Sequence, residues 1–255
     1  MAAAAALFFS ACYSADSPYT PSMPDSALID GCTFHYRLEG HGDPVVLIQG
    51  VGVHGDGWTP QLRALQQNFR CLSFDNRGMG ASQPLPSSVS VDGMARDTLA
   101  LMDHVGFASA HVIGHSMGGC IALQLALEAP ARVRTLSLLC TSARGADALR
   151  FSARMMWLGA RSRIGTRHSR RMAFLEIVHS RNYLATHDRE HAAEALRDLF
   201  GHDLGDTPSI VGPQLAALKK FDATSRLSAL ANIPTLVVSA EEDPIFPPRF
   251  GRVGA

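Results

Sequence analysis

A serine flanked by glycines is the residue most suited to chemistry in this sequence. Residues 114–118 read GHSMG, so Ser116 stands at the centre of a G-x-S-x-G motif. An apolar run of strand length, residues 111–113, precedes the motif, and an apolar stretch of helical length, residues 121–128, follows it. A tight strand-to-helix turn of this kind raises a nucleophile above the edge of a sheet. The motif predicts that Ser116 attacks a carbonyl carbon; the alternative is a Gly/Ser turn that only packs tightly.

The same turn predicts part of an oxyanion hole. A helix that begins directly after Ser116 carries positive potential at its N-terminus. The backbone amide of Met117 then points toward the oxygen of a tetrahedral intermediate, where a donor stabilises the developing negative charge. Covalent catalysis also requires a base that takes the serine proton and an acid that orients this base.

Five apolar runs of strand length predict the sheet that holds this turn. They are residues 45–49, 71–74, 111–113, 133–140 and 235–239. Their nearly continuous hydrophobicity is typical of a parallel sheet covered on both faces. Amphipathic helical patterns alternate with them, which predicts a doubly wound, mostly parallel α/β fold. Residues 33–38 are expected to begin an antiparallel edge hairpin, with residues 40–43 as its turn.

The order of these patterns divides the chain into four segments. Residues 1–24 form a flexible lead-in, residues 25–143 the first part of the core, residues 144–226 a helical cap inserted over the sheet, and residues 227–255 the second part of the core. Within the cap, residues 144–181 hold nine arginines and only two acidic residues. We interpret these arginines as a solvated basic face; attraction of an anionic substrate is the alternative.

Composition and charge exclude several classes of protein. The 255 residues are 46% hydrophobic, which is enough for one large core, and 23 basic side chains balance 23 acidic ones. Without a long basic block, we expect no nucleic-acid partner. The five cysteines form no C-x-x-C pair, and neither a metal-ligand cluster nor a dinucleotide fingerprint is present, so we expect no metal and no organic cofactor. No apolar run reaches the roughly 18 residues of a membrane-spanning helix.

The first twelve residues leave the compartment open. They read MAAAAALFFSAC, which is similar to a short signal-peptide core, but the first Lys or Arg is Arg37, so the usual positive charge ahead of the apolar stretch is missing. We favour a cytoplasmic location, with secretion or lipid anchoring as the alternative.

Four motifs together resemble those of the α/β-hydrolase superfamily, in particular its esterase and 3-oxoadipate enol-lactonase-like group with a helical cap. They are residues 45–52 (VVLIQGVG), 74–82 (FDNRGMGAS), 114–119 (GHSMGG) and 240–248 (AEEDPIFPP). The resemblance covers roughly residues 25–252. It implies that Val51 supplies the second oxyanion amide and that Asp243 is the triad acid. It also implies that Asp75 serves structure by binding backbone amides.

This resemblance implies a serine hydrolase that acts on a small carboxylic ester or lactone through an acyl-enzyme. A serine at the strand-to-helix turn disfavours the opening of epoxides and of carbon–halogen bonds, for which related enzymes use aspartate at this position. Hydrolysis of a carbon–carbon bond remains an alternative. His54, Trp58 and Met156 are candidate pocket residues. The alternatives are a solvent-facing loop position for His54 and core packing for Trp58.

The triad histidine is the member that this sequence does not supply. The family order is serine, acid, histidine, yet the last histidine is His202, which precedes Asp243. We therefore expect a core truncated before its final strand and helix, and turnover impaired by about 10⁶-fold. A substitute base among the cap histidines is disfavoured. These are His168, His179, His187, His191 and His202.

Two further expectations follow from this departure. The strand predicted over residues 235–239 would become an exposed apolar edge, so an edge-strand dimer is a hypothesis, and the oligomeric state is otherwise open. The alternative function is a catalytically silent protein that binds a small ligand or a partner through the same pocket.

Overall fold

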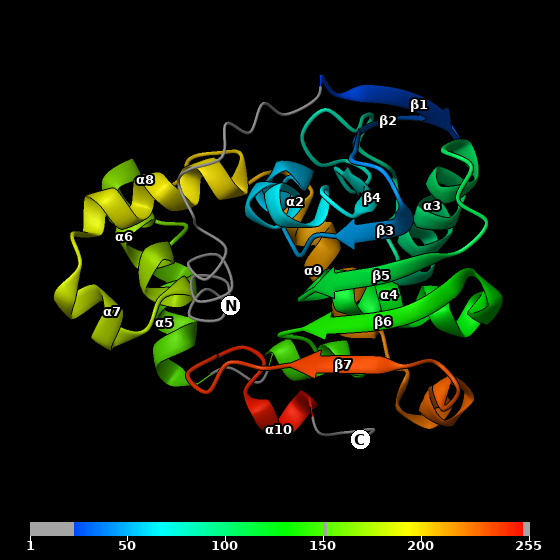
Figure 1. Ribbon diagram of the computed structural model, residues 1–255. Helices are drawn as coiled ribbons and strands as arrows, with labels where there is room; N and C mark the ends of the chain where they lie inside the picture. Colours follow the sequence, from blue (N-terminus) through cyan, green and yellow to red (C-terminus); the bar gives the residue numbers. More distant parts are fainter. Residues whose placement is uncertain (1–22, 150–151, 252–255) are drawn as a thin grey trace.

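A seven-stranded, mostly parallel sheet forms the centre of the computed structural model, which describes residues 23–149 and 152–251 (Figure 1). Residues 1–12, with the signal-like pattern, lie outside the described residues. The strands are β1 (Asp25–Ile29), β2 (Cys32–Glu39), β3 (Asp43–Ile48), β4 (Phe69–Phe74), β5 (Ala110–His115), β6 (Val133–Leu139) and β7 (Thr235–Val238). Their order in the sheet is β1-β2-β4-β3-β5-β6-β7.

The five strands from β4 to β7 in this order run parallel, as their apolar sequences predict. In β3, the last four residues, Val45 to Ile48, are buried. The hairpin prediction was wrong: β2 does not pair with β3, but lies antiparallel between β1 and β4. Asp30 and Gly31, both at positive φ, make the turn between β1 and β2. The sequence correctly indicated extended segments on both sides of residues 40–43. A short turn between two strands does not by itself show that the two strands are hydrogen-bonded to each other.

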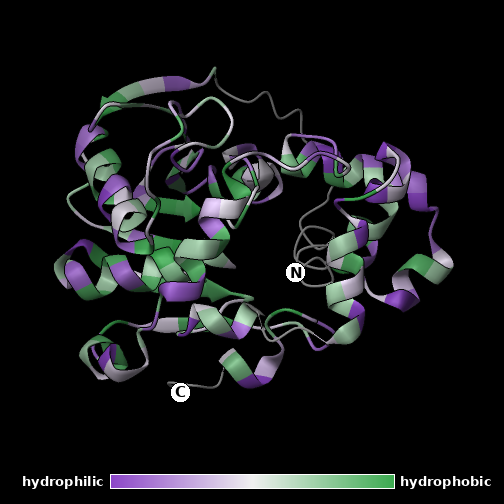
Figure 2. Ribbon diagram, turned by 180° about the vertical axis from the view of Figure 1, so that it is seen from behind, coloured by the Kyte–Doolittle hydropathy of each residue, from purple (hydrophilic) through white to green (hydrophobic). Residues whose placement is uncertain are grey.

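Helices cover both faces of the sheet. They are α2 (Thr59–Leu65), α3 (Val91–His104), α4 (Met117–Glu128), α5 (Ala153–Arg161), α6 (Arg167–Val178), α7 (Arg181–Thr186), α8 (Arg189–Phe200), α9 (Val211–Lys220) and α10 (Pro248–Gly251). Short 3₁₀ turns are η1 (Gly55–Trp58), η2 (Pro130–Arg132), η3 (Gly145–Leu149) and η4 (Thr224–Leu230). In Figure 2 the strands are largely green, and the helices around them alternate between green and purple. This is the pattern of a buried sheet under amphipathic helices.

The helices between β6 and β7 place a second layer beside the sheet. In Figure 1 the arrowheads of β3, β5, β6 and β7 point toward α5–α8, which we call the cap helices. Polar N-cap side chains begin each of these four helices: Ser152, Thr166, Ser180 and Asp188 accept hydrogen bonds from the first-turn amides. The carboxyl ends of parallel strands, where ligands bind in open α/β sheets, therefore face the cap helices.

The last described strand, β7, forms one edge of the sheet. Its partner is β6, and the side chains of Leu236 and Val237 are 58% and 43% exposed. No helix among the described residues is long and apolar enough to cross a membrane.

Candidate active site

Ser116 occupies the turn between β5 and α4 in a strained conformation. Its backbone has φ 55° and ψ −120°, a region that residues with a Cβ rarely adopt. Such strain costs about 1–3 kcal/mol and persists only where the surrounding structure enforces it. The Ser116 amide donates to the carbonyl of Leu139 at 2.9 Å, and its own carbonyl accepts from Thr141 Oγ1 at 2.7 Å. These bonds fix the turn against the end of β6.

Two glycines allow the backbone to approach this turn. A Cβ on Gly118 would overlap the carbonyl oxygen of Ile48 at the end of β3. A Cβ on Gly50 would lie 3.0 Å from Ser116 Cβ and 3.5 Å from Ser116 Oγ. The loop that follows β3 therefore packs directly against the serine, as an oxyanion-hole loop must.

A cavity of about 470 Å³ opens between this turn and the cap helices. Ser116 and Val51 lie at its core side, and Met155, Met156, Phe174, Ile177, Phe200 and Val211 contribute much of its apolar wall. Polar groups at the wall include His202, Arg163 and Asp206. A concave, mainly apolar site with a few polar groups is typical for a small-molecule ligand.

The structure brings together some of the residues that the sequence singled out. Ser116, Val51 and Met156 line the cavity, and Met117 begins α4 directly behind the serine. The Asp243 carboxylate is buried, and its Oδ1 accepts hydrogen bonds from the amides of Ile245 (2.8 Å) and Phe246 (3.0 Å). Since both of these residues line the cavity, Asp243 stands at its border.

Two candidate pocket residues lie elsewhere. Trp58 is buried on the α2 face of the sheet, where its ring meets that of His115 edge-on at 6.4 Å. His54 is not among the residues that line the cavity; its Nδ1 lies 3.6 Å from Asp75 Oδ2. The hydrogen bond and the negative charge of Asp75 raise the pKa of His54.

The loop after β4 is structural, as expected. Asp75 accepts hydrogen bonds from the amides of Gly55 (2.8 Å) and Ala81 (3.2 Å). Asn76 donates to the carbonyl of Gln49 at 3.1 Å, just before the glycine turn. This loop therefore braces the segment that carries Val51.

The histidine beside Ser116 is held neutral. Burial lowers the pKa of His115 to about 4, although the nearby negative charge of Asp243 opposes this shift. His202, in contrast, lines the cavity. Its Nε2 lies 2.8 Å from the carbonyl oxygen of Gly52, and its Nδ1 lies 3.0 Å from the carbonyl oxygen of Asp203.

Sequence reasoning missed Gln214, which lies in α9. Its Oε1 accepts a hydrogen bond of 2.9 Å from the amide of Gly52, a residue 162 positions earlier in the chain. Nothing in the local pattern of α9 distinguishes this glutamine from a surface residue. Only its complete burial, with 1% of its surface exposed, marks it.

The profile of a known family matches most of the chain. Residues 43–253 match the family described as the alpha/beta hydrolase fold. This chain belongs to the α/β-hydrolase family. The family match agrees with the parallel sheet and the strained turn at Ser116.

Relatives of this α/β hydrolase include proteins named for small-molecule hydrolysis. The RutD protein of Variovorax paradoxus, provisionally named as a carbamate hydrolase, is 35% identical over an alignment of 222 positions, which covers 84% of this chain and 79% of that protein. An enol-lactonase from Burkholderia xenovorans is 28% identical, with a TM-score of 0.73 over 91% of this chain and 86% of that one. A hydrolase from Pseudomonas aeruginosa is 26% identical, with a TM-score of 0.74 over 92% and 87% of the two chains. These relatives support a hydrolase that acts on small substrates.

Four arginines of the basic segment, Arg144, Arg154, Arg167 and Arg171, form ion pairs with acids among the described residues. Arg154 contacts Glu176, and Arg171 contacts both Asp203 and Glu190. Surface pairs of this kind contribute little individually, but they neutralise the arginines. The observed pairing favours the solvated basic face over an anion-attracting surface.

Proposed function

We propose that this α/β hydrolase cleaves a small, mainly apolar ester, lactone or carbamate with Ser116 as the nucleophile. The observation that carries the proposal is the strained serine at φ 55°, which lies between a strand end and a helix N-terminus at the border of an apolar cavity. Strain retained at a cavity is characteristic of a functional site.

The proposed mechanism assigns roles to Ser116, Val51, Met117 and Asp243. Ser116 Oγ attacks the carbonyl carbon while a base takes its proton, and the amides of Val51 and Met117 hold the oxyanion. The bond to the leaving oxygen then breaks, and the proton passes to that oxygen. Water then attacks the acyl-enzyme while the base takes a proton from it, the bond to Ser116 Oγ breaks, and Oγ takes this proton back as the acid is released. Asp243 orients the base.

The cavity supports the proposed class of substrate. Its volume of about 470 Å³ is that of a small-ligand site, and side chains of Met, Phe, Ile and Val dominate its wall. The named activities of the relatives, on a carbamate and on an enol-lactone, both involve a carbonyl bonded to a heteroatom. Such a carbonyl suits attack by a serine.

Impaired turnover of the 255-residue polypeptide is part of the proposal. The base that the family resemblance implies follows the acid, whereas the histidines of this polypeptide all precede Asp243. His202 shares the cavity with Ser116, but both of its ring nitrogens face backbone carbonyls.

Labelling with a fluorophosphonate probe tests the nucleophile. We expect the folded polypeptide to react at Ser116, and the Ser116→Ala variant and a heat-denatured sample to remain unlabelled. Turnover of a short p-nitrophenyl ester, measured in parallel, reports the whole cycle. Labelling that persists in Ser116→Ala would contradict the assignment.

The alternative is a silent member that binds a small ligand in the same cavity. The engagement of His202 by two carbonyls favours it, because that ring is not directed to a proton-transfer role. A folded polypeptide that does not label, but whose melting temperature rises with a small apolar ester analogue, would support this alternative.

A further inference from the structure

Gly52 is held on both sides by side chains from the far half of the chain. Its amide donates to Gln214 Oε1 at 2.9 Å, and its carbonyl oxygen accepts from His202 Nε2 at 2.8 Å. Gln214 belongs to α9, and His202 directly follows Gly201, the left-handed C-cap of α8. The turn after β3 is thus fixed by the region between β6 and β7.

These two bonds satisfy groups that would otherwise be costly to bury. Gly52 is buried and sits at φ 68°, outside any regular ladder that would pair its backbone. A buried backbone group without a partner costs about 1–3 kcal/mol. Gln214 Nε2, in contrast, has no hydrogen-bond partner among the described residues, so this side chain acts as the acceptor for the Gly52 amide.

The two hydrogen bonds to Gly52, which we call the Gly52 clamp, act one residue away from Val51, the proposed oxyanion donor. Because the peptide group is planar, the direction of the Gly52 amide sets the direction of the Val51 carbonyl. The orientation of the Val51 amide relative to this fixed peptide plane then depends only on the φ and ψ angles of Val51. Gly50, on the other side, packs against Ser116. Fixing Gly52 therefore restricts the orientation of the Val51 amide toward the serine.

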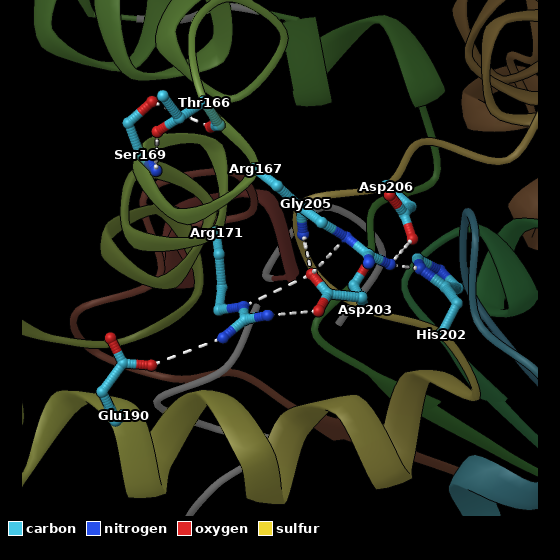
Figure 3. Close-up of polar contacts among 9 residues, drawn as sticks. All are labelled: Thr166, Arg167, Ser169, Arg171, Glu190, His202, Asp203, Gly205 and Asp206. Carbon is cyan, nitrogen blue, oxygen red and sulfur yellow. Dashed lines mark hydrogen bonds and ion pairs between the residues drawn. The ribbon is translucent and has the colours of Figure 1, made fainter.

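An ionic cluster in the cap region supports His202 in turn. His202 Nδ1 lies 3.0 Å from the carbonyl oxygen of Asp203. The Asp203 carboxylate binds the guanidinium of Arg171 and the amide of Gly205, and Arg167 lies beside it (Figure 3). Burial raises the pKa of Asp203, but these hydrogen bonds and positive charges outweigh it and lower the pKa. Asp203 is therefore held as an anion that ties α6 to the loop of His202.

We propose that Gln214 and His202 are positioning residues that orient the Val51 amide for the oxyanion. This inference rests on the proposed function, because it assigns a role within the same site. Under this proposal the region between β6 and β7 contributes to stabilisation of the transition state, in addition to forming the wall of the pocket.

The test compares variants that differ in one hydrogen bond. Gln214→Met removes the acceptor and keeps the shape, Gln214→Glu retains an acceptor, and His202→Phe removes the Nε2 donor to the Gly52 carbonyl. Gln124→Met is the matched control, because Gln124 is equally buried in α4 but bonds Glu128 and Arg226. Each folded variant is measured for its rate of fluorophosphonate labelling and for amide hydrogen exchange in residues 50–53.

We expect Gln214→Met and His202→Phe to speed exchange in residues 50–53 and to slow labelling by about 10- to 100-fold. Gln214→Glu should stay close to the wild-type rates, and Gln124→Met should lower thermal stability without changing either readout. Labelling of both variants at the wild-type rate would overturn the inference, and so would unchanged exchange.

Failure of the proposed function has a different signature. If the wild-type polypeptide is folded but does not label, Ser116 is not activated in it, and the oxyanion role of the two hydrogen bonds to Gly52 is overturned together with the proposed hydrolysis. The exchange data then test whether Gln214 fixes the backbone at Gly52. Faster exchange in residues 50–53 of Gln214→Met supports this, and unchanged exchange overturns it.

Discussion

Thr141 Oγ1 donates a hydrogen bond of 2.7 Å to the carbonyl oxygen of Ser116, and so joins the end of β6 to the nucleophile turn. The same carbonyl also accepts from the amide of Gly119 at 2.9 Å. Thr141 is buried, and it follows Cys140, which has a positive φ of 47°. The two strand ends that flank the cavity are thus both distorted and bonded to each other.

Removing this hydroxyl tests how much it stabilises the turn. We expect Thr141→Val to lower the free energy of unfolding by about 1 kcal/mol. The Ser116 carbonyl loses the hydrogen bond from Thr141 but keeps the one from the Gly119 amide. Urea denaturation measures the change. The control is Thr98→Val, a buried threonine whose hydroxyl bonds Met94 within α3. It should cost a similar amount but leave fluorophosphonate labelling unchanged, whereas Thr141→Val should slow labelling.

The strain at Ser116 predicts a gain in stability when the side chain is removed completely. Glycine adopts φ 55° without the steric cost that a Cβ imposes. We expect Ser116→Gly to be more stable than Ser116→Ala by about 1 kcal/mol, with labelling absent in both. Thermal melting of the two variants side by side measures the difference. An alanine variant at least as stable as the glycine variant would show that the turn is not strained.

The pair of His54 and Asp75 predicts a loss of stability at higher pH. The folded-state pKa of His54 is raised by the hydrogen bond to Asp75. The stabilisation is therefore complete below the unfolded pKa, about 6.5, and is lost as the pH rises through the folded pKa. We expect His54→Gln to flatten this decline in the free energy of unfolding above about pH 6.5. An equally steep decline in that variant would assign it to other groups.

His115 and His179 predict the opposite behaviour in acid. Burial lowers the pKa of each to about 4. Between about pH 6.5 and that value the unfolded chain binds protons that the folded chain excludes, so stability falls as the pH falls. The effect is roughly 3 kcal/mol for each histidine. We expect the His179→Leu variant, whose substituted residue is not among those that line the cavity, to retain more stability at pH 4.5 relative to pH 7 than the wild type does.

The exposed side chains of β7 predict association through this edge. Leu236 and Val237 present apolar surface on a strand whose described partner lies only on the β6 side. We expect sedimentation velocity to show concentration-dependent association, and Leu236→Lys to reduce it. Ile164→Lys is the control, because Ile164 is exposed but lies in no strand. A wild-type monomer at every concentration would contradict the prediction.

Local patterns in the sequence were enough to predict the parallel sheet and the serine turn. The apolar run of residues 45–49 corresponds to β3, and the amphipathic helical pattern expected between the runs of residues 71–74 and 111–113 corresponds to α3. These predictions succeeded because burial of a strand or of one helix face leaves its period in consecutive residues. The turn at Ser116 was predictable because its G-x-S-x-G motif lies in consecutive residues, although one of its glycines, Gly118, is required by a close approach to the distant Ile48.

Only the tertiary structure decided the contacts between distant segments. The pairing of β2 with β4, the burial of Trp58 behind the sheet and the bonds from Gln214 and His202 to Gly52 join residues that no spacing relates. A hydrogen bond across 150 residues or more depends on how two separately folded elements meet. Local sequence specifies the elements, whereas the packing of the complete core determines which of their polar side chains face each other.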